Sequence, residues 1–414
     1  MTSPFPVARL LLPLLAVLPL PAIAGPSCRP AWVAGWASSQ MLPTGENALP
    51  AGSLADSTLR QIVRPSLGGG RVRVRLSNLA GTAPLHLGGA SIARARAPGS
   101  SAIDPATIQS LRFDGREDVT IPAGADYLSD PIPLPVKAFD DLAISIRYTD
   151  EPSAQTSHPG SRATSWLAQG DHRAASDMSG ATRFAHWFSL AALEVEACAP
   201  AGVVVALGDS ITDGLGSTPD GNNRWTDGLA RRLQADPKTR HLAVVNQGIG
   251  GNRLLKDGLG PNALARLDRD VLAQPGVRHL IVLEGINDIG TLTRDAPVSE
   301  AEHEALVQRM IGAYRQIIAR AHARGIKVIG GTILPFMGTA YYHPDARNEA
   351  DRQAVNTWIR DAGAFDAVVD FDRVMRDPAR PDHLLPRYDM GDLLHPSPEG
   401  YRAMADAIPV ELFR

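Results

Sequence analysis

The hydrophobic pattern of this chain changes at the segment ACAPAG, residues 197–202. Before it, from about Trp32 to Val195, short apolar runs are separated by Gly, Pro and Asp. One of them, RVRVRLSN at residues 71–78, alternates strictly between polar and apolar residues, as a strand with one solvated face does. No segment of this half has a convincing helical period. We therefore predict an all-β, jelly-roll-like sandwich in the first half of the chain.

After residue 202, apolar runs alternate with longer amphipathic stretches. VVVAL precedes RWTDGLARRLQAD, HLAVVNQ precedes NALARLDRDVLAQ, and this β-α unit recurs about five times. Such alternation predicts a parallel sheet with helices on both faces. The length of 414 residues also favours two domains. We place the β-sandwich domain at residues 27–199 and the α/β domain at residues 202–414.

The amino-terminal segment, residues 1–24, has the features of a signal peptide. Arg9 precedes the apolar run Leu10–Leu20, and Ala22-Ile23-Ala24 forms a small-x-small cleavage pattern. The apolar run is too short, and too interrupted by proline, to span a bilayer. We therefore expect a secreted or periplasmic protein after cleavage, without stable membrane insertion.

The chain has two cysteines, Cys28 and Cys198. An oxidising compartment would let them pair, and the disulfide would then tie the amino terminus to the junction between the domains. Two unpaired thiols are the alternative, because the sequence cannot show that the two Cα atoms come within bridging distance.

Charge and ligand motifs narrow the classes of partner. The formal net charge is -3 with both signs interspersed, so nothing indicates a nucleic-acid partner. Acidic residues lack the spacing of a metal cage, no His/Cys cluster is present, and no phosphate-binding or dinucleotide motif occurs. We predict neither a metal nor a cofactor.

The first three strands of the predicted sheet each end in residues that suit acyl transfer, and ligands of such sheets bind beyond the carboxyl ends of the strands. The first strand ends in Gly208-Asp209-Ser210, where Ser210 is either a helix cap or a nucleophile. The glycines of NQGIGGN, after the second strand, either form a tight turn or expose a backbone N–H. After the third strand, the amide of Asn287 is suited to donate hydrogen bonds to an oxyanion.

The last strand leads through a long polar loop to YDMGDLLHPSPEGY, which supplies a base and an acid. Pro396 disfavours helical geometry at His395, and Ser397 followed by Pro398 predicts a helix start. His395 should therefore lie on a loop at the sheet edge. Asp392 can accept the proton on its far ring nitrogen, which fixes the tautomer and stabilises the imidazolium.

In the residues at these three strand ends and in the segment from Asp392 to His395, the carboxyl-terminal half resembles the SGNH hydrolases, also called GDSL-type esterases and lipases. The resemblance implies a three-layer α/β/α fold and hydrolysis without a cofactor, with Ser210 as nucleophile, His395 as base and Asp392 as orienting acid. It also implies an oxyanion hole formed by the N–H groups of Ser210 and Gly251 with the Asn287 side chain. Asp389 is a rival for the orienting acid, with a spacing that fits less well. Four blocks of residues carry the resemblance: Gly208-Asp209-Ser210, Asn246-x-Gly248-x-x-Gly251, Gly285-x-Asn287-Asp288 and Asp392-x-x-His395.

Together these features predict a secreted carboxylic-ester hydrolase that releases short acyl groups and deacetylates polysaccharide, with a small-molecule or polysaccharide ester as its partner. One alternative is a lipase or lysophospholipase of the same family. Another is a carbohydrate-binding protein with an inactive hydrolase scaffold. The first domain is similar to the β-sandwich modules of some secreted family members, and its Trp36, Trp166 and Trp187 either stack on sugar rings or pack in the core.

Overall fold

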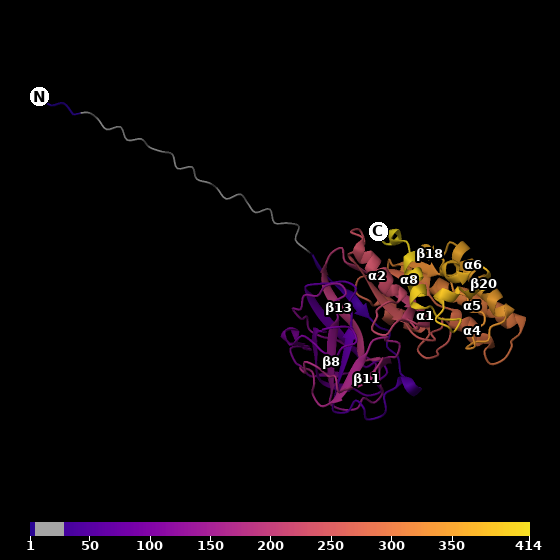
Figure 1. The fold of residues 1–414 in the computed structure, drawn as a ribbon, viewed down its shortest axis with the longest axis horizontal. Coiled ribbons are helices and arrows are strands. Elements are labelled where there is room, and N and C mark those ends of the chain that lie inside the picture. Colours follow the sequence, from indigo (N-terminus) through magenta and orange to yellow (C-terminus); the bar gives the residue numbers. More distant parts are fainter. Residues whose placement is uncertain (5–28) are drawn as a thin grey trace.

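The computed structural model describes residues 1–4 and 29–414. In Figure 1 the strands of the first half, indigo to magenta, gather in one body, and the orange and yellow helices of the second half gather beside it. Cys28 and most of the predicted signal peptide lie outside the described residues, so the signal peptide and the Cys28–Cys198 disulfide stay predictions. Within the described ranges, no helix combines the length and the apolar character needed to cross a membrane.

The first domain consists of antiparallel sheets, as the alternating pattern predicts. One sheet has the strand order β1-β13-β3-β7, and the other has β11-β10-β2-β8-β4-β5 with β6 paired to β4. The strand at 71–77 buries every second side chain, which is the expected result of its alternation. Its strands are β1 (Pro30–Ala37), β2 (Ser57–Val63), β3 (Arg71–Ser77), β4 (Leu85–Arg94), β5 (Gln109–Ser110), β6 (Val119–Ile121), β7 (Asp126–Leu128), β8 (Leu142–Tyr148), β9 (Ser157–His158), β10 (Ser165–Gln169), β11 (Thr182–Phe184), β12 (Trp187–Phe188) and β13 (Leu190–Cys198), with short helices η1 (Gly45–Asn47) and η2 (Pro105–Thr107).

The second domain has a parallel sheet with the order β15-β14-β16-β17-β18, which confirms the predicted α/β fold. Its main strands are β14 (Gly202–Gly208), β15 (Leu242–Gly248), β16 (Val277–Leu283), β17 (Lys327–Gly331) and β18 (Ala367–Val369). Its helices are α1 (Ser210–Asp213), α2 (Trp225–Ala235), α3 (Ala263–Leu267) with the π-helical turn η3 (Asp268–Leu272), α4 (Ile286–Thr293), α5 (Glu300–His322), α6 (Ala346–Asp361), α7 (Phe371–Met375), α8 (Pro398–Ala407), η4 (Pro386–Tyr388) and η5 (Val410–Phe413).

The order of the parallel strands places a crevice at the carboxyl end of β14. The chain passes from β14 to β15 on one side and then crosses to β16 on the other, and a crevice forms where the direction of winding reverses. Gly208 pairs with Gly248 of β15 and with Leu283 of β16, so the three strands end at the same level. The residues that follow them therefore meet at one edge of the sheet.

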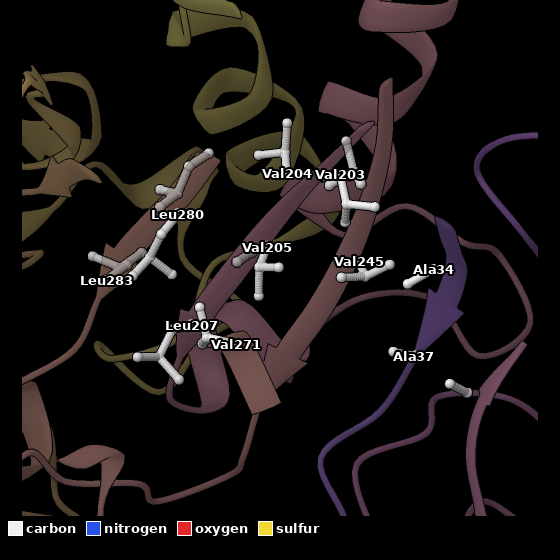
Figure 2. Close-up of a cluster of buried hydrophobic side chains, with 14 of the residues drawn as sticks. Ala34, Ala37, Val203, Val204, Val205, Leu207, Val245, Val271, Leu280 and Leu283 are labelled. Carbon is white, nitrogen blue, oxygen red and sulfur yellow. The ribbon is translucent and has the colours of Figure 1, made fainter. Parts of the chain in front are cut away.

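The two domains share one hydrophobic core. Figure 2 shows Val203, Val205 and Leu207 of β14 packed beside Val245 of β15, with Ala34 and Ala37 of β1 on the far side of that strand. Ser66 also forms hydrogen bonds with β15, the edge strand of the parallel sheet. Its Oγ accepts from the N–H of Val244 and donates to the carbonyl oxygen of Val244, both at 2.8 Å. Because an uncovered edge strand invites aggregation, this docking is a structural part of the fold.

Two expectations receive a definite answer from the fold. The predicted long polar loop after β18 instead contains α7 and the hairpin β19 (Arg376–Asp377) and β20 (Arg380–Leu384), elements too short to leave a periodic signal in the sequence. The three tryptophans pack rather than face solvent: Trp166 and Trp187 are buried, and partly buried Trp36 meets Trp187 edge-on at 4.8 Å between ring centroids.

Candidate active site

Ser210 is held at the end of β14 by a turn that another residue caps. Asp209 is the N-cap of α1, and its Oδ1 accepts a hydrogen bond from the N–H of Ile211 at 2.9 Å. Ser210 is therefore the first helical residue and not the cap. Its backbone N–H is one of those for which a helix offers no internal acceptor.

A continuous hydrogen-bonded chain joins Ser210 to an acid through His395. The Ser210 Oγ lies 2.8 Å from the His395 Nε2, and the His395 Nδ1 lies 2.6 Å from the Asp392 Oδ2. The other oxygen of Asp392 accepts the N–H groups of Leu394 and His395, which fixes the carboxylate against the loop. Burial raises the pKa of Asp392, but these hydrogen bonds outweigh it, and its net pKa is below the ordinary value.

Asp389, the rival acid, builds the turn instead. Its Oδ1 accepts the backbone N–H groups of the three residues at 391–393. The helix start predicted after His395 is confirmed: α8 begins at Pro398, and the Ser397 Oγ accepts from the N–H of Gly400 at 3.2 Å. His395 therefore lies on a loop that is anchored at both ends.

Gly251 and Asn287 line the same cavity as Ser210 and His395. Gly251 has a φ of +70°, a conformation that residues with a Cβ rarely adopt, and it follows β15. Asn287 lies in the first turn of α4. Its Nδ2 donates to the carbonyl of Asn252 at 2.7 Å, which leaves one N–H of the amide for another acceptor. The cavity has a volume of about 710 Å³.

Tyr342, which the sequence reasoning missed, fixes the orientation of this amide. Its hydroxyl lies 2.5 Å from the Asn287 Oδ1. Because the carbonyl of Asn252 only accepts, the Nδ2 of Asn287 must face it, and the Oδ1 must accept from Tyr342. The dipeptide Tyr341-Tyr342 lies in a loop, and no periodic pattern marks it.

The first domain also reaches the site, through His158 of β9. The His158 Nε2 lies 3.0 Å from the Asp213 Oδ1, and both side chains are 5% exposed. The other oxygen of Asp213 accepts the N–H of Gly250, the residue before Gly251, at 3.1 Å. A chain of contacts therefore runs from the β domain to the loop that carries Gly251.

Buried carboxylates support the loops from below. Burial raises the pKa of Asp209 to about 7 and that of Asp288 to about 6, and it raises the pKa of Glu284 well above its ordinary value. Asp288 accepts the N–H groups at 254 and 255, and the fully buried guanidinium of Arg266 faces Glu284 at 3.3 Å. These groups hold the loop after β15 in place. Among residues 1–4 and 29–414, no group of three His, Cys, Asp or Glu side chains is placed to hold a metal ion.

A Ser, a His and an Asp that are joined by hydrogen bonds beyond the strand ends of a parallel sheet have the arrangement of a serine-hydrolase triad. Residues 206–403 match the model of the GDSL-like lipase/acylhydrolase family, and this domain of the chain belongs to that family.

Solved structures similar to this chain come from several sources, and each comparison covers 50% of this chain. A lipolytic protein of the G-D-S-L family from Desulfitobacterium hafniense DCB-2 is 23% identical, with 96% of its own chain covered and a TM-score of 0.37. The acetyl xylan esterase AlAXEase is 19% identical, with 96% covered and a TM-score of 0.37. A catalytic mutant of Axe2, an acetylxylan esterase from Geobacillus stearothermophilus, is 21% identical, with 91% covered and a TM-score of 0.37. No curated protein matches the sequence.

Proposed function

We propose that this chain is a secreted serine esterase that hydrolyses carboxylic esters with short acyl groups and removes acetyl groups from polysaccharide. The observation that carries the proposal is the hydrogen-bonded chain from the Ser210 Oγ through His395 to Asp392, with distances of 2.8 and 2.6 Å. It lies in a domain of an acylhydrolase family.

In the acylation step, the Ser210 Oγ attacks the acyl carbon while the His395 Nε2 takes its proton. Asp392 orients the ring and stabilises the imidazolium. The negative charge that develops on the carbonyl oxygen is bound by the N–H groups of Ser210 and Gly251 and by the free N–H of Asn287. The alcohol then leaves with the proton that His395 returns to it.

In the deacylation step, His395 takes a proton from water, and the hydroxide attacks the acyl-enzyme. The bond between the acyl carbon and the Ser210 Oγ breaks, the proton returns to that oxygen, and the carboxylic acid leaves. The step needs neither a redox partner nor an external Lewis acid.

The walls of the cavity support a short acyl group and a hydroxylated alcohol. A Cβ built on Gly251 would lie 3.1 Å from the Leu259 Cδ1, so an apolar side chain lies beside this oxyanion donor. Polar residues, Asn47 and Thr339, form another part of the wall. Such groups suit hydroxyl-rich alcohols better than acyl chains.

Initial rates on p-nitrophenyl esters with acyl chains of two to sixteen carbons test the acyl preference. We expect the highest kcat/KM at two to four carbons and none for Ser210→Ala. A maximum at twelve or more carbons would favour the lipase or lysophospholipase alternative. Product analysis with acetylated xylan, acetylated pectin and phospholipid then tests the substrate class.

Fluorophosphonate labelling tests for an activated serine without assuming a substrate. We expect a label on the wild type and none on Ser210→Ala. A correctly folded wild type that takes up no label would favour a carbohydrate-binding protein with an inactive scaffold.

A further inference from the structure

Arg162 extends from the β domain into the wall of the candidate active site. It lies in the segment 159–164 between β9 and β10, and it lines the cavity that contains Ser210 and His395. The segment is packed tightly on the hydrolase domain. A Cβ built on Gly160 would lie 1.8 Å from the Asp213 Oδ2, so the loop backbone directly covers that carboxylate.

Hydrogen bonds from the hydrolase domain fix this segment on both sides of Arg162. The carbonyl of Ser161 accepts from the Arg224 guanidinium. The carbonyl of Arg162 accepts from the N–H of Asp220 at 2.8 Å. The Asp220 carboxylate in turn accepts from the N–H and the hydroxyl of Thr164, both at 2.7 Å. The position of Arg162 is therefore set by the docked pair of domains.

The backbone of Arg162 is held in an unfavourable conformation. Its φ is +48°, in the left-handed region that side chains with a Cβ rarely adopt. Such a conformation is strained, and it persists only where the surroundings enforce it. Glycine would remove the strain, and the chain has arginine here instead.

The guanidinium of Arg162 lacks a hydrogen-bond acceptor that its burial calls for. The side chain is partly buried, and within residues 29–414 its buried Nε has no hydrogen-bond partner. Two carboxylates of the cavity wall have other partners: Asp213 is bound to His158 and Gly250, and Asp392 is bound to His395. A buried N–H donor without an acceptor is costly, so the arrangement favours a ligand that supplies one.

Arg162 and His395 line the same cavity. The leaving alcohol must face His395 to receive its proton. Leu259 lies beside Gly251, which is one of the proposed oxyanion donors.

We propose that Arg162 binds an anionic group on the alcohol part of the substrate, and that this group is the carboxylate of an acidic saccharide. The planar fork of a guanidinium matches a carboxylate with two parallel hydrogen bonds. A phosphate offers the same chemistry, and the test separates the two. The proposal rests on the esterase function proposed above. Besides Arg162, Glu46 in η1 is a charged residue of the described cavity wall to which no bonded partner has been assigned above, and its side chain is exposed.

The test compares acetylated oligogalacturonate with acetylated xylo-oligosaccharide of the same length. For the wild type we expect a kcat/KM at least about 10-fold higher on the acidic substrate, because a charge-assisted hydrogen bond contributes that much or more. Arg162→Gln should remove the preference and change the rate on the neutral substrate by less than about twofold. Arg162→Lys should keep part of the preference, since it keeps the charge but loses the fork.

Arg162→Gly separates binding from folding. Because glycine relieves the left-handed backbone, this variant should match or exceed the wild type in Tm and still lose the acid preference. Glu46→Gln is the matched control for a general charge effect, and it should leave the ratio of the two substrates within about twofold of the wild type.

Protection of Ser210 from fluorophosphonate provides a readout that needs no turnover. Free oligogalacturonate should slow labelling of the wild type and not of Arg162→Gln, and neutral xylo-oligosaccharide should slow neither. A labelled wild type without acid preference in either assay would overturn this proposal alone. A wild type that takes up no label and hydrolyses no ester would reject the esterase function itself, and this proposal with it. If Arg162→Gln lowered only the hydrolysis of lysophosphatidic acid, the anion would be a phosphate and the saccharide assignment would be wrong.

Discussion

The hydroxyl of Tyr342 should contribute to catalysis although it does not touch the reacting atoms. Tyr342→Phe removes one oxygen and leaves the ring, which packs edge-on against Phe336 and Tyr341. The lost oxygen is the donor to the Asn287 Oδ1 at 2.5 Å, and both residues are buried. Without it, only the bond to the carbonyl of Asn252 orients the amide.

The expected size of the effect follows from this geometry. Leaving one buried acceptor unsatisfied costs about 1–3 kcal/mol. Removing an oxyanion donor completely costs about 10²–10³ in kcat, which sets the upper limit that Asn287→Ala should reach. Since Tyr342→Phe keeps the donor and loosens it, we expect kcat to fall about 5–30-fold. KM should change little, because the affected interaction forms in the transition state.

Steady-state kinetics on p-nitrophenyl acetate, with Tm measured in parallel, check this expectation. Tyr341→Phe is the matched control: Tyr341 lines the same cavity but is 57% exposed, and its loss of a hydroxyl should leave kcat within about twofold. An unchanged kcat for Tyr342→Phe, or a fall equal to that of Asn287→Ala, would contradict this positioning role of Tyr342. The first result would mean that Asn252 alone orients the amide, and the second that Tyr342 acts on the oxyanion itself.

Three further predictions concern the acids around the site. Asp392→Asn should lower kcat by roughly 10³–10⁴-fold because His395 loses its acceptor, whereas Asp389→Asn keeps the Oδ1 that accepts the turn N–H groups and should remain near wild type in kinetic assays. His158→Ala and Asp213→Asn should each lower kcat and Tm. A double-mutant cycle should show an interaction free energy above about 1 kcal/mol between the two residues. Additive effects would mean that the pair does not act as a unit. The raised pKa of Asp209, about 7, means that the folded state keeps a proton that the unfolded chain releases above its ordinary value of 3.8. The stability from this proton is present below pH 3.8 and is lost as the pH rises through about 7, so Asp209→Asn should show a smaller fall in Tm between pH 5 and pH 8; parallel curves would contradict this.

The two kinds of fold, and the strand ends at which the candidate site lies, could be predicted from the sequence alone. β3 alternates with a period of two, and β-α units repeat after residue 202. Each pattern shows, within its own segment, which side chains are buried, so it can be recognised without the tertiary structure. Ser210 and His395 could be identified as candidate site residues for the same reason. Both are polar residues placed by local chain geometry, one after a buried strand and one before a proline-marked helix start.

Which distant residues complete the cavity depends on the packing of the whole fold. His158 meets Asp213 and Tyr342 meets Asn287 across 55 residues of sequence in each case. Arg162 lines the cavity, and hydrogen bonds from Asp220 and Arg224 hold its loop. His158, Arg162 and Tyr342 lie in a short strand or in loops, where no periodic pattern of burial exists. Their positions depend on the packing of one whole domain against the other, a property of the complete fold that no local segment encodes.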